Sequence, residues 1–224
     1  MMSSRGLRHE KSKIPKSLYM YVYLIIHMYK KIAITENHLL IMNLFTKGFN
    51  KEYYIRQIHQ ITGLSPRAAQ LILKDLEEKT VLESTVRGKI RAYKLKKSIL
   101  TKQYLILSEI YKRLAVMQED PLLKEIIEKI TPAIRGIGII FGSYAKRIQK
   151  KESDIDIFIV GDSEEKTIKS IGKMYNKDIQ IKKYPFKVFN ELDKKNILVN
   201  EVLENHIIIK GIEEFIESVK KIYE

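Results

Sequence analysis

The sequence contains no cysteine among its 224 residues, so structural disulfides and thiolate metal sites are excluded. This absence fits a reducing cytoplasm, which is where we expect the protein to act. The sequence also lacks an apolar run long enough to cross a bilayer. Its longest apolar run, residues 18–28, has eleven residues and contains no charge, whereas a membrane span needs about 20. We therefore expect no membrane association.

Basic residues precede this apolar run, as they would in a signal peptide: Arg5, Arg8, Lys11, Lys13 and Lys16. A signal peptide also needs small residues at a cleavage site after the run. Tyr29, Lys30 and Lys31 stand there instead. We therefore expect residues 18–33 to form a helix that is buried or faces a partner.

Positive charge is concentrated in the first half of the chain. Residues 1–120 contain 22 Lys and Arg against 10 Asp and Glu, whereas residues 121–224 contain 19 against 17. A polyanionic partner would therefore bind the first half. The alternative is a generally lysine-rich composition, in which Lys replaces other solvated residues.

Residues 35–97 show the pattern of three helices followed by a hairpin. Thr35-Glu36 begins the first helix, and residues 55–62 form the second, with Ile55, Ile58 and Ile61 inward. Ser65 and Pro66 are a strong start signal for the third helix. That helix is expected to bury four side chains, Ala69, Ile72, Leu73 and Leu76. Residues 81–86 and 90–95 are β-prone runs on either side of a turn at 87–89.

This order of elements resembles the winged helix-turn-helix domains of prokaryotic DNA-binding regulators. The resemblance implies that Arg67, Gln70 and Lys74 face the major groove of double-stranded DNA. It also implies that Arg87, Lys89 and Arg91 on the wing contact phosphates. Two alternatives stay open, namely that the helix face is only solvated or that the domain contacts protein.

The remaining chain divides into a connecting helix and a second domain. Residues 98–113 are expected to be helical, with an apolar side made by Leu100, Leu107, Ile110 and Leu114, and to connect the halves or form a homodimer. Residues 121–131 are helical again and stop at Pro132. Short β-branched runs at 137–141, 155–160 and 178–181 then alternate with helices, which indicates an α/β or α+β domain. We expect four segments: a basic segment and helix (1–34), a mainly α winged helix (35–97), a connecting helix (98–120) and an α/β domain (121–224).

The second domain contains a motif suited to phosphate. A strand runs into Gly142-Ser143, which opens a helix. Glycine lets the backbone approach a ligand closely, and a helix N-terminus offers unpaired N–H groups to an anion. The Ser143 hydroxyl adds a further donor.

Two acids follow this motif on one strand. Asp154 lies eleven residues after Ser143, and Asp156 follows two residues later. The period of two places both carboxylates on one face, while Ile155 and Ile157 point the other way. Two carboxylates about 6–7 Å apart repel each other unless a cation lies between them, and Mg²⁺ favours one or two carboxylates together with substrate phosphates. A coincidental acidic strand end after a glycine turn is the alternative.

The spacing Gly-Ser, ten residues, Asp-x-Asp resembles the signature of the DNA polymerase β-type nucleotidyltransferase superfamily, in particular its minimal stand-alone branch. The resemblance covers about residues 120–215. It extends to Pro185-Phe186 and to residues 199–211, which are similar to the helical tail of that branch. It implies a mixed sheet, a nucleoside triphosphate substrate such as ATP, Mg²⁺ or Mn²⁺, and transfer of a nucleoside monophosphate to a hydroxyl.

Two further site residues follow from this resemblance. The family has a third carboxylate on a neighbouring strand, and Asp178 fits this position as metal ligand or base. The family motif often has glycine where this chain has Arg147, which could add a phosphate-binding cation.

Three functions remain open at this stage. The first is an enzyme that adenylylates a toxin-like partner protein, as antitoxin members of the minimal branch do, and that the winged helix targets to DNA. The second is a transcription regulator whose nucleotidyltransferase fold only senses nucleotide. The third is a scaffold with neither activity, dimerised through residues 18–31 and 99–114.

Overall fold

The structure is a computed structural model that describes residues 15–30, 33–48, 50–191 and 197–223. The chain divides into two compact units, Met1–Thr35 and Glu36–Glu224. The basic segment expected before residue 15 lies outside the described residues. The first helix was predicted to extend to residue 33, and residues 31 and 32 also lie outside them.

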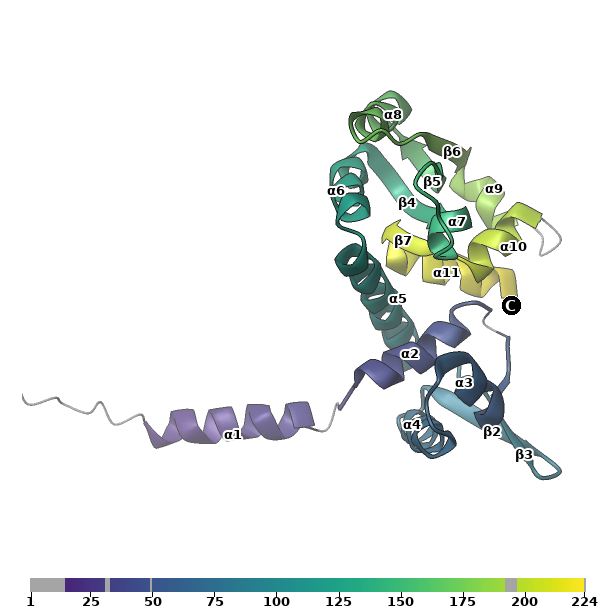
Figure 1. Cartoon of the computed structure of the whole chain (residues 1–224). Helices are drawn as coiled ribbons and strands as arrows, with labels where there is room; N and C mark the ends of the chain where they lie inside the picture. The colour runs from purple at the N-terminus through teal and green to yellow at the C-terminus, as the bar shows by residue number, and fades with distance from the viewer. Residues whose placement is uncertain (1–14, 31–32, 49, 192–196, 224) are drawn as a thin grey trace, which may run out of the picture. The chain divides into compact units, whose positions relative to one another are not determined.

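The first unit contains helix α1, Lys16–Lys30 (Figure 1). Its position matches the helix predicted over the apolar run. Taken by itself, α1 exposes tyrosine and aliphatic side chains along its whole length. None of the helices in the described part of the chain combines the length and the apolar character that crossing a membrane requires.

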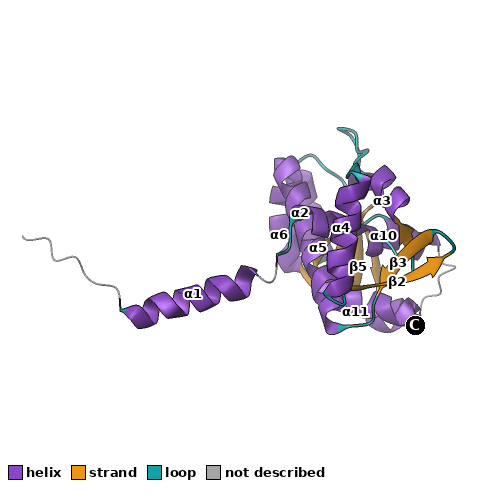
Figure 2. Ribbon diagram, turned by 90° about the horizontal axis from the view of Figure 1, so that it is seen from below, coloured by secondary structure: helices purple, strands orange, loops and turns teal. Residues whose placement is uncertain are grey.

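The second unit begins with a lobe of helices and a small sheet. Its elements in chain order are α2 Glu36–Phe45, β1 Tyr53–Tyr54, α3 Ile55–Thr62, α4 Pro66–Glu78, β2 Leu82–Arg87 and β3 Ile90–Leu95. The three strands pair antiparallel in the order β1-β3-β2. The β2–β3 hairpin ends in a turn that projects away from α3 and α4 (Figures 1 and 2). The predicted helices and hairpin are therefore present, and β1 is an addition.

Local sequence signals set the boundaries of α3 and α4. Gly63 takes a left-handed φ of 74° after α3, a conformation that glycine adopts without strain. The Ser65 hydroxyl then accepts a hydrogen bond from the Ala68 N–H and caps α4. All four side chains predicted to be buried in α4 are buried.

The predicted inward face of α3 was partly wrong. Ile58 is fully buried, but Ile55 is half-buried and Ile61 is 58% exposed. Residues three apart on a helix drift by about 60° at each step. From Ile55 to Ile61 the three isoleucines therefore spread around the helix axis more widely than the narrow face that this short helix buries.

Helix α5, Ile99–Glu119, joins this lobe to the next, and Ser98 caps it. The prediction of its apolar side was wrong, because Leu100, Leu107 and Leu114 are exposed. Its buried side includes Ser108 and Glu109 instead. The Ser108 hydroxyl lies 3.0 Å from the Leu39 carbonyl oxygen and 2.8 Å from the Asn43 amide oxygen of α2, and its single proton is shared between these two acceptors. The buried side also contains Tyr104, Leu105 and Val116. Apolar packing and polar contacts to neighbouring elements therefore decide together which face of α5 is buried.

The C-terminal lobe is built on a four-stranded mixed sheet. Its elements in chain order are α6 Pro121–Ile130, a 3-10 turn Thr131–Ala133, β4 Ile134–Phe141, α7 Gly142–Ala145, β5 Ile155–Ser163, α8 Glu165–Met174, β6 Ile179–Tyr184, α9 Phe186–Glu191, α10 Ile197–Glu204, β7 Ile207–Lys210 and α11 Ile212–Tyr223. The strand order is β6-β5-β4-β7. Strands β5 and β6 are parallel, whereas β4 is antiparallel to both β5 and β7. The mixed sheet expected from the sequence is confirmed.

The expectation of a helical tail over residues 199–211 was wrong in its second half. Helix α10 ends at Glu204, and the following isoleucines form β7 against β4. All three isoleucines of β7 are buried. β-Branched side chains fit a sheet that is covered on both faces, and such a short run carries no alternation to distinguish it from a helix.

The two faces of β5 pack against different helices. Ile155, Ile157 and Ile159 belong to a core shared with α6 and α8. Phe158 points the other way and packs against Phe189 of α9. Asp156 has the same parity as Phe158 and so lies on the α9 side of the sheet.

A buried charged cluster connects α5 to the C-terminal lobe. Glu109 accepts a hydrogen bond from His206 Nε2 at 3.0 Å and pairs with Lys112 Nζ at 2.7 Å. His206 Nδ1 faces the carbonyl oxygens of Val202 and Leu203. Both ring nitrogens thus face acceptors, an arrangement that only the doubly protonated ring satisfies fully.

Electrostatics favours the ionised form of Glu109. Burial by itself raises the pKa of Glu109, but the charges of Lys112 and His206 outweigh burial and lower it to about 2. Burial also lowers the pKa of Lys112, against the opposing effect of Glu109. Lys112 Nζ and the His206 ring both contact this carboxylate, which is fully removed from solvent.

We predict that Glu109→Gln lowers the free energy of unfolding at neutral pH by about 3 kcal/mol, since it leaves buried cations without their counterion. A depressed native pKa stabilises the fold above the unfolded-state value. That contribution is lost as pH falls from the usual 4.5 towards about 2. Denaturant unfolding at several pH values should therefore show acid destabilisation in the wild type and less of it in the variant. Glu213→Gln, at the exposed pair with Lys102, is the control and should cost about 1 kcal/mol or less. Equal acid destabilisation of the wild type and of Glu109→Gln would contradict the prediction.

Candidate functional site

The centre of the site is the turn at which β4 ends and α7 begins. Gly142 has a left-handed φ of 67°. A Cβ atom added to it would lie 2.4 Å from Asp156 Oδ2, well inside contact distance. Register supports this approach, because Phe141 pairs with Asp156 across β4 and β5. The glycine turn and the acidic strand therefore meet, as the sequence predicted.

Helix α7 is a single turn of four residues. The predicted opening of a helix at Gly142-Ser143 is confirmed, but one turn carries little macrodipole. The N–H groups of this turn can still donate hydrogen bonds to an anion, because the first N–H groups of a helix have no acceptor within it. The half-buried Ser143 adds its hydroxyl to them.

The two acids lie at the start of β5. Asp154 directly precedes the strand and Asp156 is its second residue, so the expected period of two holds. Burial raises the pKa of Asp156, and the negative charges of Asp154 and Glu201 raise it further, while Lys182 lowers it. Burial and nearby negative charge thus disfavour the ionised form of Asp156, and a cation would compensate both effects. This is the electrostatic condition expected of a cation site.

The third predicted carboxylate is placed less favourably. Asp178 precedes β6, is exposed, and accepts a hydrogen bond from the neighbouring Ile179 N–H. Gln180 is the residue in register with Asp156, and its amide donates to Asp154 Oδ2 at 2.8 Å. Among the described residues, no three His, Asp or Glu side chains gather as a metal site. A role for Asp178 stays a prediction.

Arg147, predicted to contact phosphate, points elsewhere. Its guanidinium pairs with Glu119 at 3.1 Å. Its φ of 57° is left-handed, which explains why glycine would suit this position. Lys146 lies closer to the site. Its Nζ pairs at 2.6 Å with Glu201, the acid from α10 whose charge acts on Asp156.

Sequence reasoning missed four residues around the acids: Lys146, Gln180, Lys182 and Glu201. Two of them could have been found by extending the period of two along the strand that follows Asp178. Glu201 comes from a helix far along the chain, and no local signal placed it at the site.

All six residues predicted to bind DNA are exposed on the N-terminal lobe. On α4, Arg67 donates to Gln70, and Lys74 pairs with Glu78. On the hairpin, Arg87 pairs with Glu52 and Arg91 with Glu77; no partner is resolved for Lys89 among the described side chains. These exposed pairs are weak, so phosphates could replace the carboxylates.

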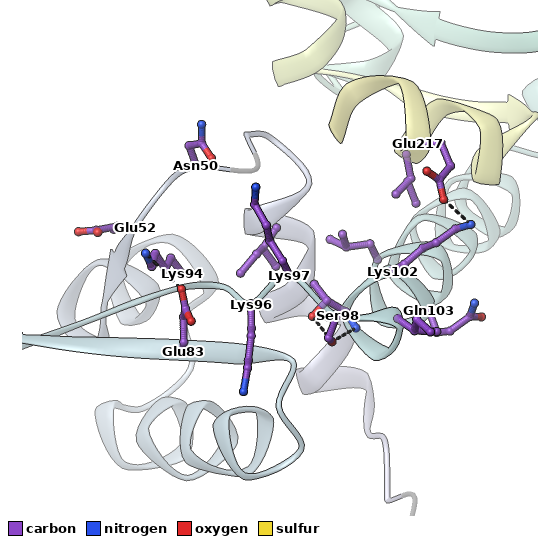
Figure 3. Close-up of a pocket in the computed structure, with 15 residues that line it drawn as sticks. Asn50, Glu52, Glu83, Lys94, Lys96, Lys97, Ser98, Lys102, Gln103 and Glu217 are labelled. Carbon is purple, nitrogen blue, oxygen red and sulfur yellow. Dashed lines mark hydrogen bonds and ion pairs between the residues drawn. The ribbon is translucent and has the colours of Figure 1, made fainter. Parts of the chain in front are cut away.

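One cavity lies away from the acids. Its volume is about 990 Å³, and its lining comes from the end of β3, the start of α5 and α11. Figure 3 shows Lys94, Lys96, Lys97 and Lys102 at this cavity, with Lys102 paired to Glu217. None of the residues of the glycine turn or the acidic pair lines it.

We predict that Gly142→Ala disrupts the site by more than backbone strain. The matched control is Gly63→Ala, which has a similar φ of 74° but nothing within 4 Å of the added Cβ. The control should lose about 1 kcal/mol of unfolding free energy from strain alone. Gly142→Ala should lose more and also weaken nucleotide binding, because Asp156 must move. Thermal denaturation and titration with a fluorescent nucleotide would measure both, and equal losses in the two variants would contradict the prediction.

Comparison with known proteins agrees with this geometry. Residues 123–214 match the family described as polymerase beta, nucleotidyltransferase. A protein of Methanocaldococcus jannaschii that carries the provisional name protein adenylyltransferase is 37% identical over 73 residues, which are 33% of this chain and 53% of that protein. The chain thus spans about half the length of this relative. A search of the solved structures gave no significant match. Residues 123–214 are a nucleotidyltransferase domain of the polymerase β type.

Proposed function

We propose that this protein transfers a nucleoside monophosphate from a nucleoside triphosphate, with ATP as the expected donor, to a hydroxyl group. The observation that carries the proposal is the contact between the Gly142 turn and Asp156. A phosphate-binding turn and an acidic pair that meet at one point can hold the two ends of a metal–triphosphate complex.

The residues present suit a divalent cation. Asp154 and Asp156 would hold it, and phosphate oxygens and water would complete its shell, since Mg²⁺ in such sites uses only one or two carboxylates. The raised pKa of Asp156 fits an acid whose ionised form needs a compensating charge. When bound, the cation supplies charge stabilisation at the phosphorus that reacts.

The chain's own groups bind and orient the triphosphate. N–H groups at the Gly142 turn and the Ser143 hydroxyl would donate to phosphate oxygens. Lys146 and Lys182 would add positive charge beside the acids. The acceptor oxygen attacks the α-phosphorus and forms the new P–O bond, while the bond to the β-phosphate breaks and pyrophosphate leaves. Asp178 or another nearby carboxylate would accept the hydroxyl proton.

The acceptor we propose is a protein side chain. The support is the name of the archaeal relative, protein adenylyltransferase. An acceptor on a protein surface needs only an accessible turn. A toxin-like partner, in the manner of antitoxins, is one protein that could supply it.

The test is transfer of label from α-³²P-ATP with Mg²⁺ to protein. We expect Asp154→Ala to lower the rate by about 100-fold or more, because it removes charge compensation at the phosphorus. Asp162→Ala is the matched control, since Asp162 is an exposed acid at the opposite end of β5 that pairs with Lys183. It should leave the rate unchanged. Transfer that survives Asp154→Ala would reject the proposed site, and nucleotide binding without any transfer would favour a nucleotide-sensing regulator.

We also propose that the N-terminal lobe is a winged helix that binds DNA. The support is the element order of α2 to β3, the exposed basic face of α4, and the excess of Lys and Arg in residues 1–120. In this proposal α4 enters the major groove and the hairpin contacts the backbone.

A gel-retardation titration at several salt concentrations tests DNA binding. The double variant Arg67→Ala/Lys74→Ala should weaken binding by about tenfold or more and flatten its dependence on salt. Lys169→Ala, an exposed lysine on α8 of the other lobe, should change neither quantity. Binding that does not respond to salt or to the double variant would contradict the proposal.

A further inference from the structure

Tyrosines of this chain differ sharply in accessibility. The chain has 13 tyrosines, and among those whose side chains the structure describes, the exposed ones are Tyr19, Tyr21 and Tyr23 of α1. Their exposed fractions are 62%, 63% and 68%. The three tyrosines therefore come from a single helix, α1, which Figure 1 shows as a separate ribbon.

The other described tyrosines are buried or half-buried. Tyr93, Tyr104 and Tyr144 lie in the core. Burial raises the pKa of Tyr93 and of Tyr104, so their phenolate forms are less available. Tyr175 is half-buried and donates a hydrogen bond to Glu125. A surface reaction at tyrosine would therefore discriminate strongly in favour of α1.

The charge around these tyrosines suits a reaction with a nucleotide. Helix α1 contains no acidic residue, and residues 1–35 contain seven Lys and Arg against one Glu. At the nucleotidyltransferase site, the three acids Asp154, Asp156 and Glu201 outnumber the two cations Lys146 and Lys182, and a bound triphosphate would add negative charge. Opposite charge raises the local concentration of an acceptor segment.

The two units are also covalently joined. The unit that carries α1 ends at Thr35, and the unit that carries the site starts at Glu36. A tether converts the encounter of acceptor and enzyme into an intramolecular or locally concentrated event. Acceptor hydroxyls on α1 thus accompany every copy of the active site.

We propose that the protein adenylylates itself on α1, with Tyr19, Tyr21 or Tyr23 as the acceptor. This inference rests on the proposed function. The phenol oxygen attacks the α-phosphorus of ATP, and an O–P bond forms as the bond to the bridging oxygen of the β-phosphate breaks. Pyrophosphate leaves, the phenol proton passes to a carboxylate of the site or to water, and no oxidant or reductant is needed. The product is a tyrosine phosphodiester that adds one negative charge to a basic segment.

The experiment incubates the full chain with ATP and Mg²⁺ and measures intact mass and peptide masses. We expect an added AMP group on the peptide that contains α1. The triple variant Tyr19→Phe/Tyr21→Phe/Tyr23→Phe should reduce this self-labelling to about a tenth or less. Tyr175→Phe is the matched control and should label like the wild type. Circular dichroism confirms that each variant is folded, which the exposed positions of the three α1 tyrosines favour.

A parallel titration with a fluorescent ATP analogue separates this inference from the proposed function. Nucleotide binding that requires Asp154, together with an unmodified α1, would overturn self-modification and leave the proposed transfer to other acceptors intact. Label on a residue outside α1 would overturn it in the same way. Absence of Asp154-dependent nucleotide binding would overturn both.

Discussion

The close approach of Gly142 to the carboxylate of Asp156 is the constraint on which the site depends. It requires a residue without a side chain at a left-handed position, directly opposite an acid that is partly removed from water. The antiparallel register of β4 and β5 fixes this approach. Burial and the charge of Asp154 both disfavour the ionised form of Asp156.

The same sheet serves stability on one face and chemistry on the other. The isoleucines of β5 that precede and follow Asp156 anchor the strand against α6 and α8. That packing holds the acids at the start of β5, on the side opposite the isoleucines. The Gln180 amide donates a hydrogen bond to Asp154 there. A rigid strand is a better support for two like charges than a loop, because the pair cannot relax by moving apart.

Helix α5 makes the two lobes of the second unit interdependent. Its buried side combines Ser108, bonded to α2, with Glu109, bonded to His206 at the start of β7. Buried polar groups of this kind impose one arrangement of the elements, because a shift would leave a charge without its partner.

The sequence by itself determined the local elements and the centre of the site. Capping at Ser65, the glycine at 63, the hairpin turn and the parity of the acids all follow from rules that act within a few residues. Tertiary structure decided the rest. It buried a face of α5 that combines Tyr104 and Leu105 with Ser108 and Glu109, and it made a strand of residues 207–210. It also paired Arg147 with Glu119 and brought Gln180 and Glu201 beside the acids. These outcomes depend on partners distant in the chain. Contacts with such partners outweigh the local conformational preference, and they leave no periodic pattern in the sequence.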